Sequence, residues 1–360
     1  VLRGEHAASI ACGLLDDEDP QLRASAAASL LANPNGNGTS QAELVLHELS
    51  TDDNPDVRAE AAHALGQVPD PSASDLLVML LYDRDLAVVR AAIASVGRRF
   101  ERSGPNPLYA TILISLMGNR RLKMEARDAL VAHGGEAIPP LMHFMRSPDE
   151  QIWVRRAVPK TVALIGLQEG ADALVENLDA PDEIVRSKIV EALVYMRTRW
   201  PEITFRRKEI SNQVRVAAEH YLRQLADLWA VSSLREARLV GPLAVWKKDG
   251  RVPTLPQQLL AQRMSRTVGN IFGLLQLIED PDDVRASQRS LLSDDSRMRA
   301  RALEYLDNTL PGGVRRNVFA VIDDSPPGDK LAAAAANFDI RSDSPERTLE
   351  RLIQIDPKQD

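Results

Sequence analysis

The six histidines of this 360-residue chain are the first candidates for catalysis, because imidazole is the commonest ligand of catalytic metals. No two of them are four residues apart, and no HExxH motif places a pair on one face of a helix. His47 and Glu48 form the single His-Glu step in the sequence. We therefore expect no metal site, no cofactor and no catalytic residue. The histidines are His6, His47, His63, His133, His143 and His220.

Two clusters of basic and aromatic residues could bind phosphate groups. Trp153 lies close to Arg155 and Arg156, a combination that would suit nucleic acid, although packing is the simpler interpretation of this tryptophan. The segment 197–211 combines five cations with two aromatic residues, which would suit a phosphate or an anionic lipid. A solvated connection between helices is the simpler interpretation here. The five cations are Arg197, Arg199, Arg206, Arg207 and Lys208.

Other catalytic signatures are missing from the sequence. There is no GxxxxGK[ST] phosphate loop, no GxGxxG dinucleotide motif and no GxSxG nucleophile motif. The aspartate-rich turns at 280–283 and 293–296 lack the glycine and the final glutamate of a calcium-binding loop. We interpret these turns as helix N-caps.

The elements that would position these side chains repeat along the first half of the chain. NPDVRAEAAHALG (54–66) combines a turn, a Val-Arg step and an alanine-rich segment, and the pattern returns in DPQLRASAAASLL (19–31) and PDEIVRSKIVEAL (181–193). Successive copies lie 31 to 35 residues apart. A period of this length indicates stacked structural repeats. The basic residues that mark the register are Arg23, Arg58, Arg90, Lys123, Arg155 and Arg186.

A second apolar pattern fills the interval between successive markers. In PSASDLLVMLLY (71–82) the leucines recur at helical spacing. Each period therefore predicts two short antiparallel helices, and the whole chain is predicted to be all-α, an α-α superhelix without a sheet. Gly66, Gly97 and Gly166 are expected to end first helices in the left-handed conformation.

The repeated arginines are predicted to be structural. Arg58 lies in the first turn of its helix, one residue after an inward-facing valine, so its side chain can reach the turn of the neighbouring repeat. Its apolar stem would pack while the guanidinium binds carboxylates or carbonyls. We expect a structural ladder of such contacts along the stack, formed by Arg23, Arg58, Arg90, Arg155 and Arg186.

Residues 19–193 resemble HEAT repeats, specifically those of phycobilisome-lyase-like proteins with the motif D-P-x-V-R-x-x-A-A-x-A-L-G. The resemblance implies a right-handed HEAT/armadillo-type solenoid that serves as a scaffold, and no reaction. Iron-binding HEAT hydroxylases need several His-Glu steps, which this chain lacks. The segment from about 200 to 355, including NIFGLLQLI and LLSDDSRMRARALEYLDNTLP, is similar to the soluble HEAT region of bacterial membrane proteins related to ATP/ADP translocases.

Three regions are expected: regular repeats in 1–196, irregular helices and a long loop in 197–256, and divergent HEAT-like repeats in 257–360. The formal net charge is −7, which disfavours nucleic acid as a partner. A single cysteine excludes an internal disulfide and favours a cytoplasmic location. No stretch is apolar enough for a membrane span. The absence of an initial methionine suggests a piece of a larger protein.

The leading hypothesis is a non-catalytic scaffold for protein–protein interaction, the cytosolic regulatory region of a larger transporter-like membrane protein. Two alternatives are a HEAT-type enzyme, either a DNA glycosylase or a lyase subunit, and a regulatory module that responds to a nucleotide or phospholipid. The partner is expected to be a basic or neutral protein segment, which the same parent chain could supply. The expected interaction surface on the second helices comprises Glu43, His47, Glu48, Asp75, His143 and Glu176.

Overall fold

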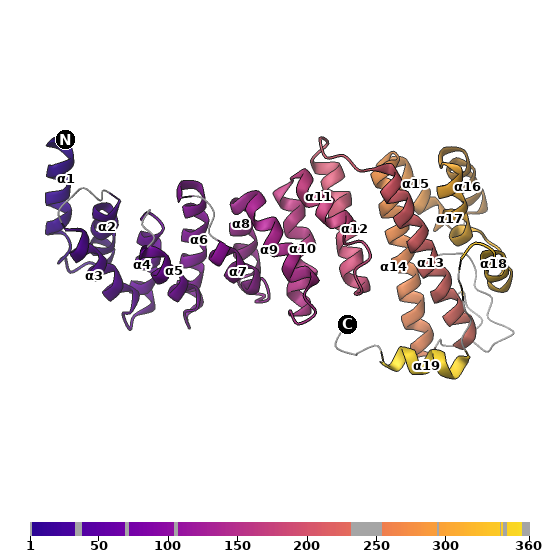
Figure 1. Cartoon of the computed structure of the whole chain (residues 1–360), viewed down its shortest axis with the longest axis horizontal. Helices are drawn as coiled ribbons and strands as arrows, with labels where there is room; N and C mark the ends of the chain where they lie inside the picture. The colour runs from indigo at the N-terminus through magenta and orange to yellow at the C-terminus, as the bar shows by residue number, and fades with distance from the viewer. Residues whose placement is uncertain are drawn as a thin grey trace. The chain divides into compact units, whose positions relative to one another are not determined.

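The computed structural model describes residues 2–32, 38–68, 72–103, 107–231, 254–293, 295–338, 340 and 344–354. Within these ranges every regular element is a helix, and no strand occurs (Figure 1). The predicted all-α fold is therefore confirmed for this part of the chain. The helices cluster into two compact units, unit 1 (Val1–Gly170) and unit 2 (Ala171–Asp360), and each is described by itself.

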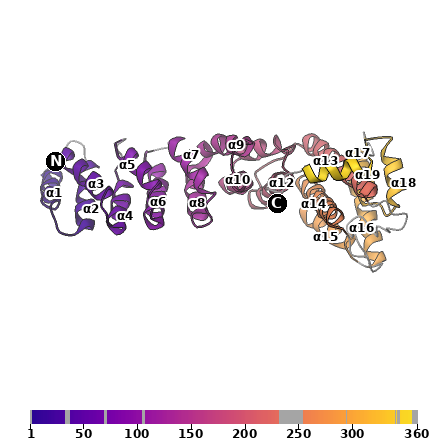
Figure 2. The ribbon, with the colours of Figure 1, turned by 90° about the horizontal axis from the view of Figure 1, so that it is seen from below.

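Unit 1 alternates two sets of helices after α1 (Leu2–Gly13). The first-helix layer consists of α2 (Pro20–Leu31), α4 (Pro55–Leu65), α6 (Leu86–Ser103), α8 (Lys123–His133) and α10 (Ile152–Ile165). The second-helix layer consists of α3 (Thr39–Ser50), α5 (Ser72–Leu81), α7 (Pro107–Leu116) and α9 (Ile138–Arg146), which follows the 3-10 turn η1 (Gly134–Ala137). Figure 2 separates the layers, with α5, α7 and α9 above α4, α6, α8 and α10.

The two layers hold one core between them. Along the first-helix layer α2 packs on α4, α4 on α6, α6 on α8 and α8 on α10. Each second helix also packs on a first helix, as α3 does on α2 and α4, and α5 on α4 and α6. Leucines at helical spacing fill the space between the layers and are fully buried, among them Leu46, Leu65, Leu77, Leu113 and Leu141. The paired-helix repeat predicted from the sequence is the repeat observed.

Turn residues before the first helices explain where these helices begin. Asp19 accepts a hydrogen bond from the backbone N–H of Gln21 at 2.9 Å, and Asn54 accepts one from Asp56 at 3.0 Å. Both helices then start with a proline, whose fixed φ suits the first helical position and whose missing N–H leaves no donor unsatisfied. The Asp-Pro and Asn-Pro steps therefore set the start of α2 and α4.

The three glycines expected to end first helices behave differently from one another. Gly166 has a φ of 74° and caps α10 in the left-handed conformation, as expected. Gly66 follows α4 but keeps a right-handed φ of −63°. Gly97 does not end a helix at all, because α6 continues to Ser103. A glycine is needed at position 66 because the end of α4 lies close to α6: a Cβ on Gly66 would be 2.7 Å from the Cβ of Ser95 on α6.

Gly66→Ala should destabilise the protein by about 1–3 kcal/mol, because the added methyl group must push α4 and α6 apart. Gly97→Ala is the matched control: a Cβ there would meet Ala129 at a comfortable 3.7 Å. Because Gly97 lies in the middle of α6, Gly97→Ala should stabilise the protein by about 0.5–1 kcal/mol. Urea unfolding followed by circular dichroism measures both, and equal signs for the two variants would contradict the packing described.

Unit 2 is built around two long helices, α13 (Arg207–Val231) and α14 (Leu255–Ile278), which lie side by side. α12 (Glu183–Arg199) and α15 (Pro281–Leu291) also pack on α14. α17 (Gly312–Ile322), α18 (Pro327–Ala334) and α19 (Pro345–Gln354) pack on α13, while α16 (Ser296–Thr309) packs on α15. The strict alternation of unit 1 is lost here.

The sequence boundaries differ from the division into units. The two units divide between Gly170 and Ala171, inside α11 (Gln168–Val175), whereas the sequence places the end of the regular repeats at 196. The predicted boundary follows the motif spacing, while α12 packs on α14 and belongs to unit 2. Most of the long loop expected before residue 257 falls in 232–253, outside the described residues.

Candidate interaction surface

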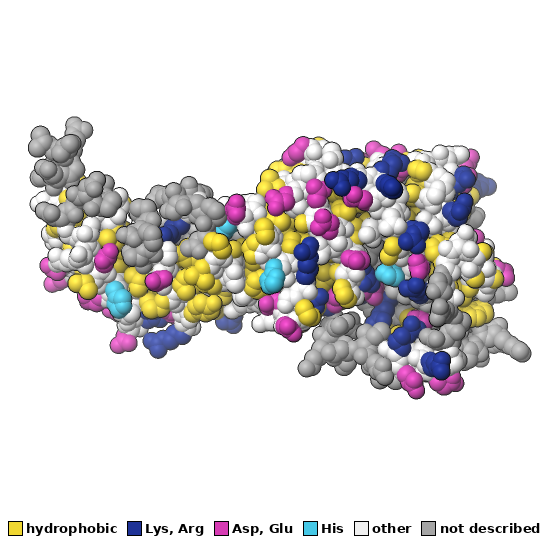
Figure 3. Space-filling model, viewed as in Figure 1, with side chains coloured by type: hydrophobic (Ala, Val, Ile, Leu, Met, Phe, Trp, Pro, Cys, Tyr) yellow, Lys and Arg dark blue, Asp and Glu magenta, His cyan; other side chains and the backbone are white. Residues whose placement is uncertain are grey.

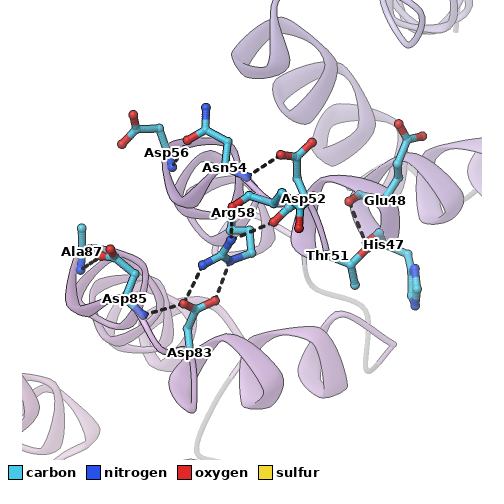
Figure 4. Close-up of polar contacts among 11 residues, drawn as sticks. His47, Glu48, Thr51, Asp52, Asn54, Asp56, Arg58, Asp83, Asp85 and Ala87 are labelled. Atoms are coloured by element: carbon cyan, nitrogen blue, oxygen red, sulfur yellow. Dashed lines mark hydrogen bonds and ion pairs between the residues drawn. The ribbon is translucent and has the colours of Figure 1, made fainter.

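Arg58 binds both oxygens of a carboxylate beyond its own helix pair. Its Nε donates to Oδ2 of Asp83 at 2.7 Å and its Nη2 donates to Oδ1 at 2.9 Å, while its Nη1 donates to the carbonyls of Asp52 at 2.7 Å and Asp53 at 3.0 Å (Figure 4). The two side chains are only 7% and 9% exposed. Asp83 lies in the turn before α6, so Arg58 ties the turn that starts its own helix to the turn of the next repeat.

The electrostatics of this pair match its geometry. The hydrogen bonds from Arg58 hold the pKa of the Asp83 carboxyl below its ordinary value, and the same bonds raise the pKa of the Arg58 guanidinium. Asp83 also accepts from the backbone N–H of Asp85 at 2.8 Å, so its carboxylate is occupied by protein donors. Arg58 acts as a structural clamp between repeats.

The other marker arginines do not repeat this clamp. Arg90 reaches the next repeat, where its Nε donates to Glu125 at 2.9 Å and its Nη2 to the carbonyl of Arg121 at 3.1 Å. Arg155 turns back to the carbonyl of Met145 at the end of α9, at 3.1 Å. Each of these two arginines therefore has the expected contact with a neighbouring repeat.

The continuous ladder along the stack is not observed, and this expectation needs correction. Arg23 lies 3.6 Å from the exposed Glu48 on α3, the partner helix of its own repeat. Arg186 donates to the carbonyls of Ala180 and Pro181, just before its own helix. A basic residue recurs in every copy, but the acceptor that it binds differs from copy to copy.

The turn residues explain why Arg90 behaves differently from Arg58. Asp83 accepts from the N–H two residues on, and Asn119 does the same before α8 by accepting from Arg121 at 2.9 Å. Asn119 therefore makes the same kind of turn contact as Asp83 but offers a neutral amide. Without a carboxylate there, Arg90 pairs with Glu125 instead, and that pair is 46% and 39% exposed.

The second-helix layer exposes a surface of different chemistry. Its four helices carry the carboxylates of Glu43, Glu48 and Asp75 and a single lysine or arginine, Arg146. In the first-helix layer the basic side chains outnumber the acidic ones. Figure 3 faces the second-helix layer and shows hydrophobic side chains gathered on it. Large apolar side chains that are 41% or more exposed on these helices are Leu44, Met79 and Leu108, and Tyr82 directly after α5 is 70% exposed.

A groove between α3 and α5 brings three of the predicted surface residues together. Glu43, His47 and Asp75 line a hollow of about 250 Å³, whose remaining walls are apolar. Glu48 and His143 are also exposed, Glu48 close to Arg23 and His143 on α9. Glu176 belongs to unit 2 and is exposed there. The apolar walls come from Leu31, Leu46, Leu65, Ala73 and Leu76.

The basic segment 197–211 is partly neutralised by its own surroundings. Arg207 donates to Glu279 at 2.9 Å and to the carbonyl of Ile278 at 2.6 Å, and Arg206 pairs with Glu209 at 2.9 Å. Arg199 lies over the ring of Trp200, 4.6 Å from its centroid. Arg197 and Lys208 lie on α12 and α13 in the same segment. The predicted anion-binding patch therefore already has protein partners at Arg206 and Arg207.

Trp153 is 53% exposed on α10, and the guanidinium of Arg156 lies 5.7 Å from its ring centroid. The tryptophan is therefore not a core residue, and of the expected core or surface-groove packing only the core alternative is wrong. It lies on a first helix, on the layer richer in basic side chains.

A partly buried polar cluster in unit 2 has no signal in the sequence. Glu183 on α12 lies 3.3 Å from Arg266 and 3.7 Å from Arg263 on α14, and the three side chains are 16%, 25% and 24% exposed. A small cavity of about 30 Å³ is lined by Glu183, Arg186 and His220 among others, enough for about one water. Burial raises the pKa of Glu183 and lowers that of His220. Sequence spacing gives no signal for pairs about 80 residues apart.

His220 should make unit 2 lose stability in mild acid. Burial, with the charges of Arg186 and Arg223, lowers its pKa in the folded state. The unfolded state therefore takes up the proton first, so stability falls as pH drops below the unfolded value of about 6.5 and stops falling below the folded pKa. His220→Gln should flatten this slope in urea titrations at a series of pH values. An unchanged slope would contradict the burial of a neutral imidazole.

No group of three or more His, Cys, Asp or Glu side chains that could hold a metal occurs in the described part of the chain. The same ranges contain no helix that is both long and apolar enough to cross a bilayer.

Comparisons with known proteins bear on the repeats. The family model of HEAT repeats matches residues 10–97 and 110–194, and no curated protein matches the chain. An engineered protein is 21% identical with a TM-score of 0.31, covering 53% of this chain and 96% of its own. A second engineered protein is 16% identical with a TM-score of 0.31, and the match covers 98% of this chain and 96% of that protein. Human deoxyhypusine hydroxylase in complex with glycerol is 20% identical with a TM-score of 0.23, and the match covers 53% of this chain and 84% of that enzyme. The regular elements of the described ranges are all helices, and residues 10–97 and 110–194 match HEAT repeats, which form an α-α solenoid in unit 1.

Proposed function

We propose that this protein is a non-catalytic scaffold that binds another protein through the second-helix layer of unit 1. The observation that carries the proposal is the difference between the two layers. The second helices expose apolar side chains and carboxylates with one arginine, whereas basic residues collect on the first helices. Stacked repeats present such a face as an extended binding surface. A partner that complements it is a basic or neutral segment with apolar side chains.

The experiment compares two labelled probes on the full chain by fluorescence anisotropy at about 0.15 M salt, near physiological ionic strength. One is the peptide acetyl-KLLKKLLKKLLK, and the other is a 20-base-pair DNA duplex. The peptide should bind saturably and the duplex should not. Tight duplex binding with a steep inverse salt dependence would overturn the proposal in favour of a nucleic-acid enzyme, for which the exposed Trp153 beside Arg156 is the supporting observation.

We further propose that the chain is the cytosolic regulatory region of a larger bacterial membrane protein. The support is the similarity of the segment from about 200 to 355 to the soluble region of translocase-related proteins. The parent chain could then supply the bound segment. The reading frame upstream of Val1 tests this proposal: ten or so apolar spans are expected there, since each bilayer crossing takes about 20 apolar residues. An upstream frame without spans would refute it.

A further inference from the structure

The groove between α3 and α5 has the shape of a pocket for one long side chain. Its volume of about 250 Å³ lies below the roughly 300–1,000 Å³ of typical small-molecule pockets. The walls are leucines and an alanine from four helices, and Leu46 and Leu65 are exposed by 1% or less. An occupant must therefore bring an apolar stem.

Two carboxylates at the rim of the groove favour an occupant whose apolar stem ends in a positive charge. Glu43 and Asp75 are both exposed, and neither carboxylate forms a hydrogen bond or an ion pair with any residue that the structure describes. Glu48, one turn further along α3, differs because Arg23 lies 3.6 Å away. Two unneutralised carboxylates beside an apolar hollow complement a side chain with an apolar stem and a cationic head.

The surroundings of the groove indicate that this side chain belongs to a protein. Leu44 on α3 is 71% exposed and Met79 on α5 is 41% exposed, so each helix that forms the groove also exposes an apolar side chain. A free polyamine would satisfy the carboxylates but would leave these side chains in water. A peptide with leucines next to its basic residue would cover them as well.

We propose that the groove is the anchor pocket for a lysine or arginine of a partner segment in which apolar residues flank the basic one. This inference rests on the proposed scaffold function and specifies its partner. The stem lies against Leu46, Leu65 and Leu76, and the cationic head is shared by Glu43 and Asp75. Partner recognition is then centred on α3 and α5.

The test uses the full chain and the labelled peptide acetyl-KLLKKLLKKLLK. The double variant Glu43→Gln/Asp75→Asn should weaken peptide binding about ten-fold, because it removes the charges that face the cationic head. The control Glu60→Gln/Asp128→Asn removes two carboxylates from α4 and α8 of the first-helix layer and leaves the net charge equal to that of the first variant. It should change affinity less than two-fold. Equal losses in the two variants would overturn the inference, since they would show a response to net charge alone.

A photo-crosslinker on one of the internal lysines of the peptide separates failure of this inference from failure of the scaffold proposal. Crosslinks to α3 and α5 are expected. Crosslinks confined to α7 and α9 would overturn the anchor pocket and leave the scaffold proposal standing. Crosslinks confined to α6, α8 and α10 or to unit 2, or an absence of peptide binding, would overturn both. A peptide with glycine in place of every leucine should bind at least ten-fold more weakly, and equal binding would show that the apolar walls are not used.

Discussion

Arg58→Ala should destabilise unit 1 by about 3–5 kcal/mol, the range expected when one partner of a buried ion pair is removed. Asp83, whose side chain is 9% exposed, would lose the guanidinium that neutralises it. The carbonyls of Asp52 and Asp53 would each lose a hydrogen-bond donor. One unsatisfied buried group alone would cost about 1–3 kcal/mol. The structure raises the expectation because the contact is bidentate and buried.

Arg90→Ala is the matched control, because Arg90 occupies the marker position of the next repeat. Its ion pair with Glu125 is 46% and 39% exposed, so its loss should cost at most about 1 kcal/mol. Chemical unfolding of the two variants under identical conditions measures the difference. Similar losses at the two positions would show that burial of the carboxylate does not determine the contribution of the marker arginine.

The Arg58–Asp83 pair also predicts a dependence on pH. Because the folded pKa of Asp83 is lowered by Arg58, the stabilisation is fully present above the unfolded value of about 3.9 and is lost as pH falls through the folded pKa. The gap in stability between wild type and Arg58→Ala should therefore be constant at neutral pH and shrink below about pH 4. A gap that stays constant down to pH 2 would contradict the ionic nature of the contact.

Phe272→Ala should destabilise unit 2 by about 3–5 kcal/mol. Phe272 is fully buried on α14, the helix on which α12, α13 and α15 all pack. The cavity left by the ring cannot be filled without moving these helices, so both the transfer and the cavity penalties apply. Phe272→Leu keeps most of the volume and should cost less than about 1.5 kcal/mol.

Leu255→Ala at the start of the same helix is the control, because that side chain is 67% exposed. It should change stability by no more than about 0.5 kcal/mol. Differential scanning calorimetry of the full chain resolves the effect if unit 2 melts as a separate transition. If Phe272→Ala and Leu255→Ala lower stability equally, α14 is not the centre of the unit 2 core.

Much of unit 1 could be predicted from the sequence because its information is local. The interval from Arg58 to Arg90 gives the length of one repeat, and the leucine pattern of α5 shows that a second helix lies within it. Together they predict paired helices. What local patterns cannot give is the neighbour that a residue meets in space. Gly97 looked like a helix end, yet α6 continues past it. Gly66 was assigned a special backbone angle, whereas its real role depends on Ser95 in the next repeat.

The same reasoning accounts for the errors in the predicted sites. A basic residue recurs in each marker position, but the acceptor depends on the turn of another repeat, which holds Asp83 in one case and Asn119 in another. Glu43 and His47 could be placed together because they lie one turn apart on α3. The approach of Asp75 to them depends on how α5 packs, and the pairing of Glu183 with Arg266 joins different helices of unit 2.

Amide hydrogen exchange of the full chain, with and without the basic peptide, tests the central claim that the second-helix layer of unit 1 is the binding face. Peptide binding should slow exchange in α3 and α5, and also in α7 if the apolar side chains beyond the groove are covered. The exchange of α6, α8 and α10 should not change, because these helices belong to the opposite layer and none of them lines the groove. Protection confined to these three helices or to unit 2 would contradict the claim.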